Sequence, residues 1–169
     1  AALADLPEAP TPVVDPRFNE YDAASVLSAF HCGDERAMRS TGDRRGYFTA
    51  VRSALQAWSR LEEAPAGTES WRAFGARVVA AADEICAGLE PSAVVLVVTS
   101  GGVIGRLIAA ALNADAEAAI QLNLQTRNTG ITALFGTRYS GGAAVLLLLG
   151  LGGLATTVWR CVGFARDSD

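Results

Sequence analysis

Five consecutive apolar residues, Val94 to Val98, constrain the fold of this 169-residue chain more than any other segment. A strand without polar residues is typical of one buried on both faces, which favours a parallel sheet covered by helices. The strand ends at Thr99-Ser100-Gly101-Gly102, and a helical pattern follows from Val103 to Leu112. Strand, glycine turn and helix together predict a β-α unit of an α/β fold.

The segments before this strand show helical periodicity. Apolar residues recur at helical spacing over residues 47–61 and again from Trp71 to Gly88, which predicts two amphipathic helices. A short helix is expected from Asp22 to Phe30, and an extended segment among the prolines at residues 7–16. The segment from Ile120 to Phe135 predicts one or two strands around a polar corner.

Composition excludes several classes of protein. The net charge of −4 and a sequence pI of about 5.0 leave no basic surface for a nucleic acid. Three widely spaced cysteines and one histidine argue against a disulfide framework or a zinc site. No cofactor is expected. The first residues lack the pattern of a signal peptide, which favours the cytoplasm.

The turn from Ser100 to Val103 is a candidate anion site, because glycines allow close backbone approach and a helix N-terminus presents unpaired amides. A turn that uses glycine for geometry alone is an equally good interpretation. The spacing Ser100-x-Gly102-x-x-Gly105 is only a relaxed dinucleotide fingerprint, since no acidic residue ends a second strand. A serine hydrolase is disfavoured, because Val98 stands where the elbow needs a small residue and His31 precedes the serine.

Four segments in the same order resemble the second half of the histidine phosphatase, or phosphoglycerate mutase-like, superfamily. These segments are Asp15-Pro16-Arg17-Phe18-Asn19-Glu20-Tyr21-Asp22, Trp71 with Phe74, Val94 through Ile104, and Leu122 through Thr132. The resemblance covers about Pro12 to Phe135. It implies a three-layer α/β/α sandwich around a mostly parallel sheet, here incomplete because the N-terminal strand and helix are missing. It also implies phosphoryl chemistry through a phosphohistidine, without a metal.

The resemblance also implies roles for particular residues. The family's Arg-His-Gly motif, which supplies the nucleophile, is absent from this chain. Ser100 takes the position of the second family histidine, and Glu20 falls where many members place the acid that protonates the leaving group. A solvated loop carboxylate is the alternative for Glu20, and a surface ion pair is the alternative for Arg127. The implied phosphate-binding residues are Ser100, Gly101, Gly102, Arg127 and Asn128.

The chain has no charged residue between Arg138 and Arg160. The run 139–159 is long enough to cross a bilayer, which gives a membrane anchor as one interpretation. A shifted reading frame is the other, because all 14 cationic residues are arginine, as in G/C-rich genes, and the resemblance stops near Phe135. The expected organisation is a partial histidine phosphatase-like domain over 1–136 and an atypical apolar tail over 137–169.

The function that the resemblance implies is a phosphoric monoester hydrolase or phosphomutase that acts on a small phosphorylated metabolite. This chain is expected to be inactive, because it lacks the nucleophile motif. The alternatives are a non-catalytic phosphate- or nucleotide-binding α/β module and a membrane-tethered protein. The expected partner is a phosphorylated small molecule or inorganic phosphate, and a membrane only if the run 139–159 is authentic.

Overall fold

The computed structural model describes residues 11–30, 42–64, 66–89, 94–128, 130–136, 144–150 and 160–164. In chain order the elements are η1 (Pro16–Phe18), α1 (Ala23–Ala29), α3 (Arg44–Arg60), α4 (Trp71–Ala87), β1 (Val94–Thr99), α5 (Gly101–Ala111), α6 (Ala116–Gln125), β2 (Ile131–Gly136), β3 (Ala144–Gly150) and β4 (Arg160–Phe164). The prediction of an α/β chain is confirmed, and so are the helices expected before the strand.

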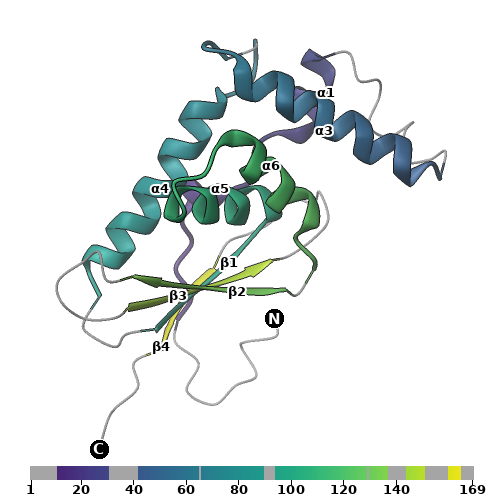
Figure 1. Cartoon of the computed structure of the whole chain (residues 1–169). Coiled ribbons are helices and arrows are strands. Elements are labelled where there is room, and N and C mark those ends of the chain that lie inside the picture. Colours follow the sequence, from purple (N-terminus) through teal and green to yellow (C-terminus); the bar gives the residue numbers. More distant parts are fainter. Residues whose placement is uncertain are drawn as a thin grey trace, which may run out of the picture.

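The strands form one mixed sheet in the order β2-β3-β1-β4 (Figure 1). The central strands β1 and β3 are parallel, whereas β2 pairs antiparallel with β3, and β4 pairs antiparallel with β1. The prediction of a mostly parallel sheet is therefore wrong for the described strands. In Figure 1 the labelled helices lie on one side of this sheet, with α5 and α6 above it.

The predicted strand over 94–98 is confirmed as β1, but its two faces differ in burial. Val95, Val97 and Thr99 are buried, and the residues between them keep partial exposure. Buried and partly exposed residues alternate along the strand, because successive side chains of a strand point to opposite faces of the sheet. An uninterrupted apolar run thus does not require equal burial of both faces.

Four of the helices begin at a side chain that accepts a hydrogen bond from the first helical turn. These caps are Asp22, Asp43, Ser70 and Asp115, which accept from the amides of Ser25, Gly46, Ala73 and Ala118. Such caps satisfy one of the amides that a helix N-terminus leaves unpaired. Helix α5 differs, because its N-cap Ser100 makes no capping hydrogen bond through its side chain.

The prediction of strands over 120–135 is wrong for its first half, which continues α6. The Asp115 cap starts this helix, and Glu117 accepts from Gln121 one turn later at 2.7 Å. Alanines at three of the first four positions add the highest helix propensity. The second half of the segment is confirmed as a strand, β2.

A tight turn joins α5 to α6. Asn113 has a φ of 51°, and the amide of Ala114 donates to the carbonyl of Ala109 at 2.8 Å, the pattern of a Schellman cap. The two helices then pass so closely that a Cβ on Gly105 would lie 2.5 Å from the Ala119 carbonyl oxygen. This close approach places α6 beside the first turn of α5.

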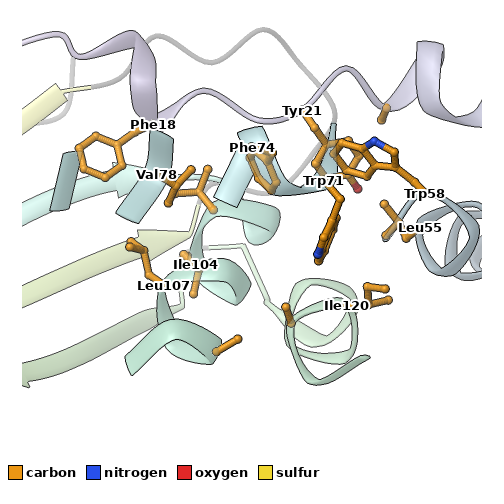
Figure 2. Close-up of a cluster of buried hydrophobic side chains, with 14 of the residues drawn as sticks. Phe18, Tyr21, Leu55, Trp58, Trp71, Phe74, Val78, Ile104, Leu107 and Ile120 are labelled. Atoms are coloured by element: carbon orange, nitrogen blue, oxygen red, sulfur yellow. The ribbon is translucent and has the colours of Figure 1, made fainter. Parts of the chain in front are cut away.

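An aromatic cluster forms the core between the helices (Figure 2). Trp58 of α3 is fully buried, with ring centroids 5.1 Å from Tyr21, 5.2 Å from Trp71 and 5.9 Å from Phe74. Its indole Nε1 donates to the Glu69 carbonyl oxygen at 3.0 Å, which satisfies the one polar atom of the side chain. The cluster therefore fixes Tyr21, the residue that follows Glu20.

Part of the apolar C-terminal run lies in the sheet as β3, and β4 follows it. Residues 137–143 and 151–159 are outside the described part of the chain, as is His31. Among the described residues, no helix combines the length and the apolar character needed to cross a membrane. The anchor and the shifted reading frame therefore both stay predictions.

Candidate functional site

The loop that carries Glu20 is fastened to α4 by Arg77. The Arg77 guanidinium donates to the carbonyl oxygens of Arg17 at 2.6 Å and Asn19 at 2.9 Å. Its other nitrogens, Nε and Nη2, donate to the two carboxylate oxygens of Glu69 at 2.9 and 2.6 Å. Arginine suits this role because its planar fork presents several donors in fixed directions.

A second contact group holds the start of the same loop. Asp15 accepts from the Arg17 amide at 2.9 Å and from the Arg17 guanidinium at 2.7 Å, and Arg17 also pairs with Glu84 of α4. The hydrogen bond from the Arg17 side chain is the main reason that the pKa of Asp15 is lowered. The loop is therefore attached to α4 at two points before it reaches Glu20.

The Glu20 carboxylate points at the first turn of α5. Its Oε2 accepts from the Gly102 amide at 3.0 Å, and its Oε1 accepts from the Tyr21 amide at 3.3 Å. A Cβ on Gly102 would overlap the Glu20 carboxylate and lie 2.8 Å from the Tyr21 ring. Glycine is needed at residue 102 for this contact.

The environment of Glu20 favours its protonated form. The residue keeps partial exposure, but its carboxyl end is buried, and this burial raises its pKa. The Ser100 hydroxyl, the Gly102 and Tyr21 amides and the charge of Arg77 oppose the rise without cancelling it. A carboxyl group with a raised pKa can donate a proton near neutral pH.

Ser100 is the second polar group at this point. It is 8% exposed, and its Oγ is buried without a hydrogen-bond partner. The hydroxyl acts on the pKa of Glu20, yet it makes no hydrogen bond of standard geometry with that carboxyl group. A buried hydroxyl without a partner of good geometry is able to donate a hydrogen bond to a ligand oxygen at this point.

Helix α6 closes the third side of the site through Asn123. A Cβ on Gly101 would lie 2.8 Å from Asn123 Oδ1 and 3.0 Å from its carbonyl oxygen. Asn123 Nδ2 donates to the Tyr21 hydroxyl at 3.2 Å. Asn123 thus links α6 both to the glycine turn and to the loop that carries Glu20.

The structure brings four of the predicted site residues together: Glu20, Ser100, Gly101 and Gly102. Arg127 and Asn128 follow α6 with exposed side chains, and no described contact joins Arg127 to the turn. Sequence reasoning missed Arg77 and Asn123, whose contacts join residues about 60 and 102 positions apart. Neither residue belongs to a local pattern that signals such contacts.

The chain belongs to the histidine phosphatase superfamily (branch 1), whose family model matches residues 34–150. The matched range covers more than half of the chain, includes the turn from Ser100 to Gly102 and ends with β3. Glu20 precedes the matched range, so its assignment depends on the resemblance of the segment around it and on its contact with Gly102. Neither the curated proteins nor the solved structures gave a match.

The buried Glu20 carboxyl group predicts a pH-dependent effect on stability. Its pKa is raised in the folded state above the ordinary value of 4.5, so folding favours the protonated form. This contribution is fully present below the unfolded pKa and is lost as the pH rises through the folded pKa. Glu20→Gln should therefore gain stability relative to the wild type as the pH rises above the ordinary carboxyl pKa of 4.5 and through the raised pKa of the folded state.

Urea unfolding at several pH values, followed by tryptophan fluorescence, measures this difference. Glu62→Gln makes the same chemical change at an exposed position and serves as the control. If the free-energy difference between Glu20→Gln and the wild type does not change with pH, burial of an ionised Glu20 carries no penalty and the expectation is wrong.

Proposed function

We propose that this chain provides the general acid and part of the phosphate site of a phosphohistidine-dependent phosphatase or mutase-like protein. Its substrate would be a small phosphorylated metabolite. The observation that carries this proposal is the Glu20 carboxyl group, whose pKa is raised, held on the Gly102 amide beside the unpaired Ser100 hydroxyl. Membership of the histidine phosphatase superfamily supports the same reaction class.

In this proposal the start of α5 binds the phosphoryl oxygens. The amides of Gly101 and Gly102 and the Ser100 hydroxyl act as donors, with the positive end of the helix dipole behind them. Glu20 gives its proton to the departing alcohol oxygen. Arg127 and Asn128 would stand at the mouth of the site. Ser100 donates a hydrogen bond but lacks the positive charge of an imidazolium, so electrostatic stabilisation would be weaker than with a histidine.

The nucleophile would not come from this chain. The sequence has one histidine, His31, and no Arg-His-Gly motif. We therefore take the chain as catalytically incomplete: residues 1–136 would be part of a cytoplasmic histidine phosphatase-like domain, and residues 137–169 an atypical tail. A complete domain would have the second helix layer of a three-layer sandwich on the free side of the sheet.

We expect the chain to bind inorganic phosphate without hydrolysing an aryl phosphate. Phosphate should raise the melting temperature, and Ser100→Asp should abolish the shift, because it places a negative charge where the phosphate oxygens bind. Ser53→Asp, the same change at an exposed position on α3, should keep it. A turnover rate above that of a heat-treated sample, and unaffected by Ser100→Ala, would show that the active site is elsewhere.

A non-catalytic phosphate- or nucleotide-binding module is the second candidate. The unpaired Ser100 hydroxyl favours it, because that group can bind an anion whether or not a nucleophile is present. Both candidates predict phosphate binding, and they differ in turnover. If the gene encodes an Arg-His-Gly motif upstream and its product hydrolyses a phosphate ester, the phosphatase proposal is supported. If the gene encodes no such motif, the binding module is supported.

A further inference from the structure

The proposed anion position at the start of α5 already holds the Glu20 carboxyl group. Glu20 Oε2 accepts a hydrogen bond from the Gly102 amide at 3.0 Å, in the first turn of an 11-residue helix. A carboxylate there is stabilised by the same helix amides and dipole that would hold a phosphate. Ser100 is 8% exposed, and its buried hydroxyl has no hydrogen-bond partner. It is therefore a second donor for a ligand oxygen at this helix terminus.

The charges around Glu20 do not balance two anions. The groups that face Glu20 are the Tyr21 amide of its own loop and the Ser100 hydroxyl and Gly102 amide of the start of α5. Helix α6 approaches through Asn123, which donates a hydrogen bond to the Tyr21 hydroxyl. Among the described residues, Arg77 of α4 is the cation that acts on Glu20, and it is already paired with Glu69. An oxyanion next to an ionised Glu20 would meet like-charge repulsion in a buried place.

We propose that the Glu20 carboxylate competes for the anion position of α5, and that an oxyanion binds there only when Glu20 has taken up a proton. The proton lets one negative group, rather than two, face the helix terminus. This inference depends on the proposed function for the position of the ligand, and it adds a second role for Glu20. If Glu20 acted as a general acid alone, its replacement by glutamine would leave the affinity for a product anion nearly unchanged.

Sulfate is the decisive probe, because its charge is constant between about pH 5 and pH 8. Sulfate and inorganic phosphate are titrated into the full chain and followed by calorimetry. For the wild type we expect the sulfate affinity to fall about tenfold from about pH 5 to pH 8, with about one proton taken up per bound anion at the upper end. Two buffers with different ionisation heats give the proton count.

Glu20→Gln keeps the shape and the acceptor of the side chain but removes its charge. It should bind sulfate about tenfold more tightly than the wild type at about pH 8, with little pH dependence and no proton uptake. Glu20→Ala removes the carboxyl group from this position and should also bind sulfate more tightly than the wild type. This second variant tests the inference if Glu20→Gln does not fold. Glu62→Gln should behave as the wild type, which excludes an effect of net charge.

Two results would overturn the inference in different ways. Sulfate binding that is independent of pH, with equal or weaker affinity in both Glu20 variants, would show that Glu20 does not compete, and it would leave the proposed phosphate site standing. Absence of sulfate and phosphate binding in the wild type and in both variants would overturn the proposed phosphate site and this inference together.

Discussion

Trp58→Ala is expected to lower the free energy of unfolding by about 3–5 kcal/mol. The side chain is fully buried and contacts the rings of Tyr21, Trp71 and Phe74, so its removal leaves a cavity between α3 and α4. Tyr21 loses its largest neighbour, and the Glu20 loop loses support on its core side. Urea unfolding followed by circular dichroism measures the loss.

Two variants on the same helix calibrate this effect. Trp58→Phe keeps a ring in the cluster but loses the hydrogen bond from Nε1 to the Glu69 carbonyl, and should cost about 1–2 kcal/mol. Phe48→Ala removes an aromatic side chain that is 45% exposed and should cost less than about 1 kcal/mol. If Trp58→Ala and Phe48→Ala were equally costly, the aromatic cluster would not be the core of the protein.

The helices could be predicted from the sequence because their signals are local. The apolar spacing over 47–61 and from Trp71 to Gly88 sets one buried face for α3 and one for α4. Most of the large apolar residues in these patterns are buried in the core, including Leu55, Trp58 and Phe74, whereas Phe48 is 45% exposed. The glycine turn after β1 was predicted for the same reason, since strand, turn and helix are contiguous.

The strand directions required information that the sequence does not carry locally. Strand β2 pairs antiparallel with β3, and β4 pairs antiparallel with β1. Strand β3 lies in the apolar C-terminal run and β4 directly follows it, and the composition of this run predicted no strand. Helix α6 was a different case. Its Asp115 cap and the pair of Glu117 with Gln121 are both visible in the sequence, but the apolar residues after Ile120 are equally compatible with a strand.

The candidate site was predictable only in part. Glu20 and the turn at Ser100 lie 80 positions apart, and a family resemblance rather than a local pattern connected them. The contact between the Glu20 carboxylate and the Gly102 amide depends on how Arg77 fastens the loop. Hydrogen bonds of this kind follow from the packing of α4 against the loop, so they appear only once the fold is known.

Gly105→Ala is expected to lower the free energy of unfolding by about 2–3 kcal/mol and to weaken phosphate binding. The new Cβ would lie 2.5 Å from the Ala119 carbonyl oxygen and 3.0 Å from the Asn123 amide nitrogen, and neither backbone atom can rotate away. Overpacking of this size outweighs the gain of about 1 kcal/mol that alanine brings to a helix interior. Helix α6 must therefore move, and Asn123 moves with it.

Gly88→Ala is the matched control, because its Cβ would meet nothing closer than 3.7 Å and its φ of −91° suits any residue. It should change stability by less than about 0.5 kcal/mol and leave phosphate binding intact. Amide chemical shifts at Gly101 and Tyr21 should change in Gly105→Ala alone, since Asn123 contacts both residues. A stable Gly105→Ala variant with unchanged shifts would mean that α5 and α6 do not approach as closely as the structure places them, and that Asn123 does not hold the site together.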